Sequence, residues 1–289
     1  MAQRPPNCRV NYQAMQRMGV VFAGLGNMGQ GSNTLLDASG FGNHGTLTNM
    51  AIPATATSGW DYDPTLGRPK LKLAGTSQYV ALTRAISPCL PTGHFSIGMF
   101  INPTNIANSW YLCGERETVT DPDQGFAFAF YGATAGDPLS VTQWGQWGQD
   151  SSASGIVAGI WQHVAVTYDR IKLRFYRNGI EISNHAKTTA MVPCPGRPCF
   201  IGDVNNVGSP AASFIGGMSD VIIAKEAWNV PIIQALADPS NVMLRVGGVS
   251  MLLDPKRRLF RAFPSGGGAP AGFKPYWIPQ RNRMIGATL

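Results

Sequence analysis

The sequence is poor in charged residues and lacks long hydrophobic runs. Charged side chains make up only 13% of its 289 residues, whereas apolar side chains make up 44%. No apolar run reaches the roughly eighteen residues that indicate a transmembrane helix. The first residues, MAQRPPNCRVNYQ, lack the apolar stretch of a signal peptide. The sequence therefore predicts an ample core, no membrane span, and synthesis in the cytoplasm.

Cysteine is scarce, and its odd count argues against a disulfide framework. The chain contains five cysteines, Cys8, Cys89, Cys113, Cys194 and Cys199. An odd number without a secretion signal argues against structural disulfides. The close pair Cys194 and Cys199 lacks the C-x-x-C spacing of zinc and redox sites, and no second pair completes four ligands. We expect reduced thiols, with a local disulfide between Cys194 and Cys199 as the alternative.

Helical periodicity is nearly absent, which argues against a dinucleotide-binding domain. Gly24, Gly26 and Gly29 have G-x-G-x-x-G spacing after the apolar segment 20–23. In such a domain a helix must follow, so that its N-terminal amides hold the pyrophosphate. The residues after Gly29 are instead rich in Gly, Asn, Asp and Ser, which favour turns. The glycines are therefore interpreted as the end of a strand that enters a loop.

What the sequence does contain is a series of short strands. Alternating apolar and polar residues predict strands at 95–101, 125–131, 161–168, 171–177, 180–182, 200–202 and 218–223. Asp169-Arg170 and Asn178-Gly179 are typical hairpin turns. Only residues 230–237, closed by Asp238-Pro239, have the pattern of a short amphipathic helix. The sequence thus predicts an all-β, antiparallel sandwich with one short helix.

Positive charge is concentrated at the two ends of the chain, whose net charge is +7. Residues 1–18 contain three arginines and no acid, and residues 246–289 contain seven basic residues and one acid. The second segment also contains a linker-like run at 264–270 and an aromatic and basic run at 273–283. Basic arms on a near-neutral body favour attachment to another surface. Solvated tails are the alternative interpretation.

Several motifs occur in a characteristic order. They are Gly19–Leu25, the loop Asp37-Ala-Ser-Gly-Phe-Gly-Asn-His-Gly-Thr-Leu47, the hairpin Trp161–Tyr168 with Phe175–Gly179, the strand Phe214–Ile223 and the segment Ile232–Pro239. In these motifs the chain resembles the laminin-G-like, concanavalin A-like jelly-roll domains of bacterial surface proteins and phage virion proteins. The resemblance implies a jelly-roll β-sandwich over residues 19–245, with extended basic arms at 1–18 and 246–289.

Glucanases share this fold, so glycoside hydrolysis needs a separate test. The resemblance implies that such enzymes carry E-x-D-x-x-E on one strand face, and this string does not occur here. Glu115 and Glu117 can share a face, but Asp121 and Asp123 lie in a proline-containing turn. Retaining glycosidases need two carboxylates about 5 Å apart. We therefore expect no enzyme and keep a jelly-roll glycoside hydrolase as the second alternative.

Calcium is the one cofactor that the resemblance implies. Related jelly rolls hold Ca²⁺ between the loop after the first strand and the penultimate strand, which here points to Asp37, Asn43 and Asp220. The ion prefers six to eight oxygen ligands. Asp37 and Asn43 are also typical turn-capping residues, and this is the alternative interpretation.

A sugar-binding surface is predicted where aromatic and amide residues alternate. The segment 143–149 places Trp144 and Trp147 beside Gln143 and Gln146, in a loop or edge strand. Flat rings and amide donors suit stacking on a pyranose. The alternative is packing within the core or contact with a protein. His163 alternates with apolar neighbours and is interpreted as a packed structural residue.

We therefore expect a structural virion protein of a bacteriophage, made in the host cytoplasm and displayed on the virion surface. It would be a capsid decoration or cement protein, or another component anchored by its arms. A carbohydrate-binding adhesin is the first alternative. Expected partners are other virion proteins, further copies of the chain, and a surface glycan; nucleic acid is not expected. The expected anchors are Arg4, Arg9, Arg257, Arg258, Arg261, Tyr276, Trp277, Arg281 and Arg283.

Overall fold

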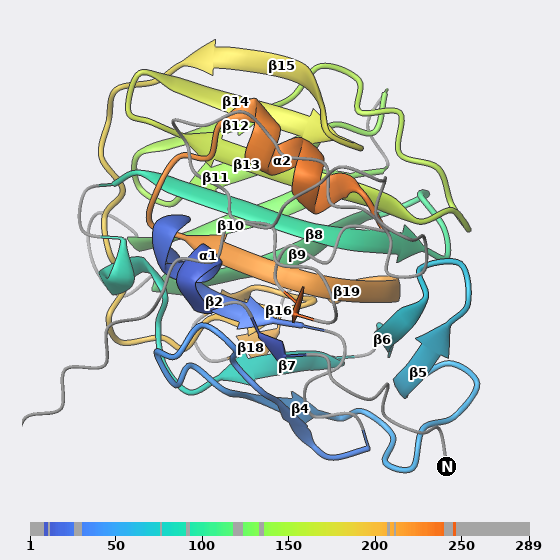
Figure 1. The fold of residues 1–289 in the computed structure, drawn as a ribbon. Helices are drawn as coiled ribbons and strands as arrows, with labels where there is room; N and C mark the ends of the chain where they lie inside the picture. Colours follow the sequence, from blue (N-terminus) through green and yellow to red (C-terminus); the bar gives the residue numbers. More distant parts are fainter. Residues whose placement is uncertain are drawn as a thin grey trace, which may run out of the picture. The chain divides into compact units, whose positions relative to one another are not determined.

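Two β-sheets form the body of the protein, seen in a computed structural model (Figure 1). The structure describes residues 9–10, 12–25, 31–75, 77–90, 93–117, 124–132, 136–206, 209–210, 212–239 and 245–246. The segment 248–289 divides from this body as a second unit and lies outside the described residues. The predicted β-sandwich is confirmed.

The first sheet has ten strands. Its order is β12 (Trp147–Asp150), β11 (Leu139–Gln143), β10 (Gln124–Tyr131), β9 (Ser109–Glu117), β16 (Phe200–Ile201), β7 (Tyr79–Leu82), β4 (Gly45–Thr48) and β3 (Thr34–Leu35). Beside β9 lie β17 (Asn205–Asn206) and then β18 (Ser209–Pro210). Neighbouring strands are antiparallel, apart from the two-residue pairing of β17 with β9.

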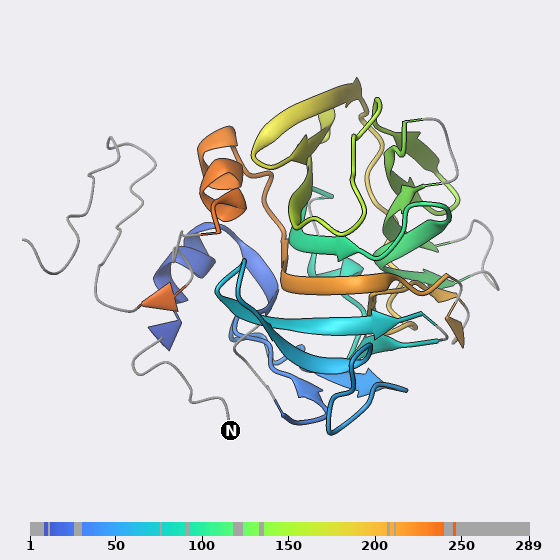
Figure 2. The same cartoon turned by 90° about the vertical axis from the view of Figure 1, so that its right-hand side faces the viewer.

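The second sheet has eight strands and carries the site described below. Its order is β15 (Ile180–Ala186), β14 (Lys172–Arg177), β13 (Gln162–Tyr168), β8 (Phe95–Pro103), β19 (Ile215–Ala224), β6 (Arg68–Ala74) and β5 (Gly59–Asp63). The first half of β19 pairs with β6, and its second half pairs with β2 (Val20–Gly24). Figure 2 shows β8 and β19 side by side near the middle of this sheet.

The core lies between the two sheets. Phenylalanines 126, 128 and 130 on β10 and Ile97, Met99 and Ile101 on β8 are fully buried in it. Successive side chains of a strand point to opposite faces. The residues that alternate with these core positions on β8 and β6 therefore lie on the outer face of the eight-stranded sheet, among them Lys70, Lys72 and Asn102.

Both predicted hairpin turns are present. Asn178 and Gly179 have φ angles of 48° and 80°, the positive values that a tight two-residue turn between β14 and β15 requires. At the preceding turn Arg170 has φ 62°, and the Asp169 carboxylate accepts hydrogen bonds from the N–H groups of Ile171 and Lys172. Short polar side chains at these positions thus fix the register of three neighbouring strands.

The structure contains a second α-helix that the sequence analysis did not predict. Helix α2 (Val230–Ala237) matches the prediction and contacts β13 and β8. Helix α1 (Tyr12–Arg17) lies within the segment that was expected to be an arm. Met15 and Met18 are buried, and the Trp228 indole donates to the Met18 carbonyl at 3.0 Å. Because these residues pack on the body, residues 12–18 belong to it rather than to an extension.

The two terminal segments meet in a small antiparallel pair. Strand β1 (Arg9–Val10) pairs with β20 (Arg245–Val246), with Arg9 opposite Val246. The chain therefore enters and leaves this pair side by side. The structure describes only the backbone of these four residues.

Candidate functional site

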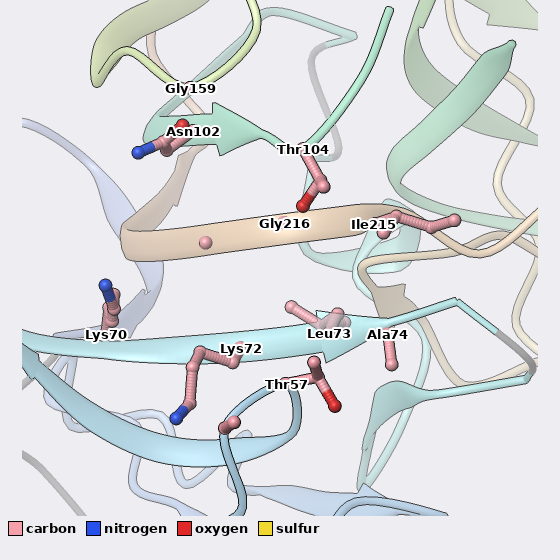
Figure 3. A pocket seen from close by; sticks show the side chains of 12 residues that line it. Thr57, Lys70, Lys72, Leu73, Ala74, Asn102, Thr104, Gly159, Ile215 and Gly216 are labelled. Carbon is pink, nitrogen blue, oxygen red and sulfur yellow. The ribbon is translucent and has the colours of Figure 1, made fainter. Parts of the chain in front are cut away.

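A groove lies on the outer face of the eight-stranded sheet, across β6, β19 and β8 (Figure 3). Its cavity volume is about 490 Å³, which falls in the range of roughly 300–1,000 Å³ that is usual for ligand pockets. We call it the outer groove. It is lined by Ala56, Thr57, Lys70, Lys72, Leu73, Ala74, Asn102, Thr104, Gly159, Ile215, Gly216 and Gly217.

Two glycines on β19 lie along the groove, and neighbouring groups occupy the space that their side chains would take. Gly216 has φ +145°, and a Cβ atom there would overlap the carbonyl oxygen of Asn102. A Cβ atom on Gly217 would lie 2.7 Å from the Trp161 ring. Side chains at these positions would therefore force neighbouring groups to move, and the Trp161 ring and the Lys70 side chain cover Gly217.

Backbone hydrogen bonds hold the β8 side of the groove. The Thr104 N–H donates to the Ile215 carbonyl at 3.0 Å, and the Gly159 N–H donates to the Pro103 carbonyl at 2.8 Å. The loop after β8, the loop before β13 and the start of β19 are thereby tied together. A rim fixed in this way loses little conformational freedom when a ligand binds.

The opposite rim carries two lysines on one face of β6. The Lys70 ammonium donates to the Asp63 carboxylate at 2.8 Å, and the Lys72 ammonium lies 3.3 Å from a carboxylate oxygen of Asp61. Burial would raise the pKa of Asp63, but hydrogen bonds, led by that from Lys70, outweigh this effect and lower the pKa to about 2. Asp63 is therefore an anion that anchors Lys70.

Uncharged polar side chains also face the groove. Thr57, Asn102 and Thr104 line it, and their side chains make no hydrogen bond to any residue that the structure describes. Figure 3 shows Asn102 and Thr104 on the β8 side and Thr57 on the β5 side. The groove thus offers an amide and two hydroxyl groups to a ligand from opposite rims.

The predicted sugar-binding segment forms a hairpin at the edge of the other sheet. The end of β11, the turn 144–146 and β12 make this tryptophan hairpin, and β12 is the edge strand. Arg116 lies over the Trp144 ring, with Cζ 4.0 Å from the ring centroid. Trp147 packs against the core and makes an edge contact with Tyr168, with centroids 5.6 Å apart. The rings therefore already have protein partners, as the alternative interpretation held.

Of the two amides that the sequence predicted for sugar binding, only one is open to solvent. Gln143 is 1% exposed, and its amide donates to the carbonyl oxygen of Gly125 at 2.8 Å. Gln146 is exposed in the turn. Gln143 thus holds the hairpin in place and does not present its amide to a ligand, contrary to the sequence-based expectation.

The two glutamates considered for hydrolysis have different surroundings. Glu115 is fully buried, and its carboxylate accepts hydrogen bonds from the N–H groups of Ile86 and Ser87 at the 3₁₀ turn Ser87–Cys89. Burial raises the pKa of Glu115 to about 7. Glu117 pairs with Arg197 at 2.6 Å. Asp121 and Asp123 lie outside the described residues.

The three residues expected to bind calcium do not share one ligand set. The Asp37 carboxylate accepts hydrogen bonds from the N–H groups of Ala23, Ser39 and Asn43. Strand β2 separates it from β19, because Gly24 faces both Val221 and Asp37; that distance corresponds to about 10 Å. Asp220 pairs with Arg68. Asp37 thus caps the turn that follows it, whereas the buried Asn43 amide donates to the Val21 carbonyl on β2 at 2.8 Å.

His163 is the packed structural residue that its alternation predicted. It is buried in β13 and makes an edge contact with Phe100 at 5.1 Å between centroids. Burial lowers its pKa to about 3. The structure has Cys89, Cys113, Cys194 and Cys199 as free thiols.

The expected anchors largely lie beyond the described part of the chain. Only the backbone of Arg9 is described, in β1. The rest are outside the described residues: Arg4, Arg257, Arg258, Arg261, Tyr276, Trp277, Arg281 and Arg283. So are Gly26 and Gly29, but the chain continues from them into a turn and β3 rather than a helix. No described helix is long and apolar enough to cross a membrane.

Sequence reasoning missed the outer groove. Two signals were present: adjacent glycines inside a predicted strand at 216–217, and lysines two residues apart at 70 and 72. A glycine in a strand marks a bulge or a close approach. Neither signal indicates a groove until the neighbouring strands are known.

The fold and the groove define a jelly-roll protein with a ligand-sized depression on one outer sheet face. Residues 74–234 match the family model of the concanavalin A-like lectin/glucanases superfamily. This match spans more than half of the chain, which therefore belongs to that superfamily. No curated protein sequence matches the chain significantly.

Solved structures show the same fold. Domain 4 of AbnA, a GH43 extracellular arabinanase from Geobacillus stearothermophilus in complex with arabinotriose, matches with a TM-score of 0.55 and 15% identity, over 76% of this chain and 98% of that one. A Trypanosoma rangeli sialidase matches with a TM-score of 0.53 and 13% identity, over 76% of this chain but only 32% of its own. At these identities the likeness concerns the fold alone.

Proposed function

We propose that the protein binds a glycan in the outer groove without hydrolysing it. The carrying observation is the groove itself, a cavity of about 490 Å³ with apolar lining residues and with polar side chains on both rims. A ligand pocket typically combines an apolar surface with a few well-placed polar groups. The groove has this composition, because its lining combines alanines, glycines and Ile215 with the polar residues Asn102, Thr104 and Thr57.

The chemistry of a sugar fits these surfaces. The C–H face of a pyranose or furanose can lie against the apolar lining residues Leu73, Ala74 and Ile215. Its hydroxyl groups can then reach the Asn102 amide and the Thr104 and Thr57 hydroxyls, which have no partner among the described residues. A site that hydrogen-bonds ligand hydroxyls discriminates strongly against ligands that lack them.

Binding without hydrolysis is supported by the charges at the site. No carboxylate is among the twelve lining residues. The nearest described acids along β5, Asp61 and Asp63, are paired with the two lysines. Glu115 is buried and caps a turn. Glycoside hydrolysis would need two carboxylates at the scissile bond.

The comparisons support a glycan ligand. The chain belongs to a superfamily of lectins and glucanases, and a protein of the same fold, domain 4 of AbnA, is known in complex with arabinotriose. This similarity suggests that the ligand is a glycan. The residues of the groove determine which sugar binds.

A glycan array probed with the full chain tests the proposal, followed by calorimetry on the best ligand. We expect the double variant Asn102→Ala/Thr104→Ala to weaken binding about tenfold or more, because each lost hydrogen bond contributes about 1 kcal/mol. The matched control, Trp144→Ala/Gln146→Ala, changes an equally exposed surface on the tryptophan hairpin and should leave affinity unchanged. If the control variant loses binding and the groove variant keeps it, the ligand lies at the hairpin. If no glycan binds, the proposal fails.

A second function, structural attachment to a bacteriophage particle, has one favouring observation. The pairing of β1 with β20 brings the two basic terminal segments together where they meet the body. We therefore propose that the termini anchor the protein in a virion, as a decoration or fibre component, while the body is displayed.

Copy counting by mass spectrometry on purified particles tests this second proposal. Hundreds of copies would indicate a capsid decoration, and a handful would indicate a tail or fibre component. A chain that ends at residue 247 should no longer bind particles. If it binds as tightly as the full chain, anchoring through the C-terminal segment is wrong.

A further inference from the structure

We infer that the outer groove selects a negatively charged saccharide, one that carries a carboxylate or sulfate group, through Lys70 and Lys72. This inference rests on the proposed function, because it names the class of glycan that the same groove takes.

The charge of the lining is positive on one side only. Its twelve residues include two lysines and no acidic residue. The lysine side chains are only 18% and 16% exposed. Attraction between charges strengthens as solvent is removed, so partly buried ammonium groups attract an anion more strongly than free surface lysines do.

Both ammonium groups keep hydrogen-bonding capacity for a ligand. A lysine ammonium has three N–H donors. Among the described residues, Lys70 donates to the Asp63 carboxylate and Lys72 donates to the Thr55 carbonyl oxygen. Even when the Lys72 ammonium also donates to the Asp61 carboxylate, at least one N–H donor on each lysine remains for a ligand.

The carboxylates hold the lysines in place without entering the groove. Asp61 and Asp63 lie on β5, behind β6 as seen from the groove, and neither lines it. A charge already positioned by a neighbouring carboxylate needs little reorganisation when the ligand arrives. Because the carboxylates are on β5 and the lysines are on β6, the positive side of this group of four charges faces the groove.

The positions of the side chains place the anionic group. Figure 3 shows Lys70 directed toward β19, across from Asn102, while Lys72 turns toward the segment of Thr57. Lysine acts as a point charge without the planar fork of arginine, so the geometry favours an anion without choosing between carboxylate and sulfate.

Calorimetry with the full chain on matched ligands tests the inference. The ligands are trigalacturonate, a sulfated galactotriose and neutral galactotriose, together with sialyllactose and lactose. We expect the charged members to bind about tenfold more tightly than their neutral partners at 50 mM salt, with a smaller difference at 500 mM salt because ions screen the charges. Equal binding of charged and neutral sugars would overturn the inference and leave the proposed function standing. Binding by none of these ligands would overturn the inference, whereas the proposed function fails only if no glycan on the array binds.

Variants that change a single charge separate an effect on ligand binding from an effect on folding. Lys70→Gln should weaken binding of the charged ligand about tenfold, and Lys172→Gln, which removes the same charge from an exposed position on β14, should change it less than twofold. Asp61→Asn should strengthen binding, because it removes a competing negative charge beside Lys72. An increase in affinity cannot arise from damage to the fold. If Lys70→Gln and Lys172→Gln have the same effect, or if Asp61→Asn weakens binding, the inference is wrong.

Discussion

The outer groove and the tryptophan hairpin are the two regions of the molecule that could receive a sugar, and they differ in what their residues already contact. The hairpin has aromatic rings, but Arg116 covers the Trp144 ring and Trp147 packs against the core. The groove has glycines and small polar side chains, and its Asn102 and Thr104 side chains have no partner among the described residues. A ligand site is thus better indicated by polar groups that lack partners than by the presence of aromatic residues.

The difference follows from where the two regions lie in the sheets. The hairpin is at an edge, where large side chains cover the end of the core between the sheets. The groove lies on an outer sheet face, where alternation places only every second residue. Neighbouring strands supply its polar rims.

The largest expected effect concerns a glycine in each region. Gly216→Ala should lower the free energy of unfolding by about 3 kcal/mol, because a Cβ atom at φ +145° is strained and overlaps the Asn102 carbonyl. Gly148→Ala in the hairpin is the matched control. Its Cβ atom would meet only the Thr142 hydroxyl, at 3.8 Å, so its effect should stay within about 0.5 kcal/mol. Urea unfolding measures both. Similar losses in the two variants would show that Gly216 has no special constraint.

The two sheets should also respond to pH in opposite ways. Glu115, in the sheet of the hairpin, has a pKa raised by burial from 4.5 to about 7. The folded state therefore binds more protons than the unfolded state between these values, and stability should fall as pH rises from 4.5 to 7, by on the order of 3 kcal/mol. Glu115→Gln should flatten this fall. A pH profile of urea unfolding that is the same in both proteins would contradict the assignment.

His163, in the sheet of the groove, gives the opposite sign. Burial lowers its pKa from 6.5 to about 3. The unfolded state therefore binds more protons in this range, so the stability contributed by neutral His163 is present above pH 6.5 and lost as pH falls toward 3. His163→Phe, which keeps an aromatic ring beside Phe100, should remove this loss at acid pH. If both variants change the profile in the same direction, one of the two pKa shifts is wrongly signed.

Much of the fold could be predicted from the sequence because its signals are local. Alternation gave β13 and β14, Asn178-Gly179 gave their neighbour β15, and the capped apolar run gave α2. Helix α1 was missed because its six residues are too short for a periodic pattern, although Met15 and Met18 lie three apart on one face.

The site was less predictable because it depends on strands that are distant in the sequence. Lys70, Asn102 and Gly217 come from β6, β8 and β19, and only the sheet order brings them together. The tryptophans at 144 and 147 were correctly placed at an edge, but the ring contact of Arg116 with Trp144 depends on the pairing of β9 with β10 and β11. Local patterns predict strands, whereas free and occupied faces are settled by tertiary packing.

The smallest expected effect tests whether the Trp144 ring is truly covered. A double-mutant cycle with Arg116→Ala and Trp144→Ala should give a coupling energy of about 0.5–1 kcal/mol in urea unfolding, as expected for a guanidinium group stacked on a partly exposed ring. The same cycle with Arg177 in place of Arg116 should give no coupling, since Arg177 contacts the Gly155 carbonyl instead. If Arg116 and Trp144 are also uncoupled, the ring face is available to solvent. The tryptophan hairpin would then again be a candidate surface for sugar binding, in addition to the outer groove.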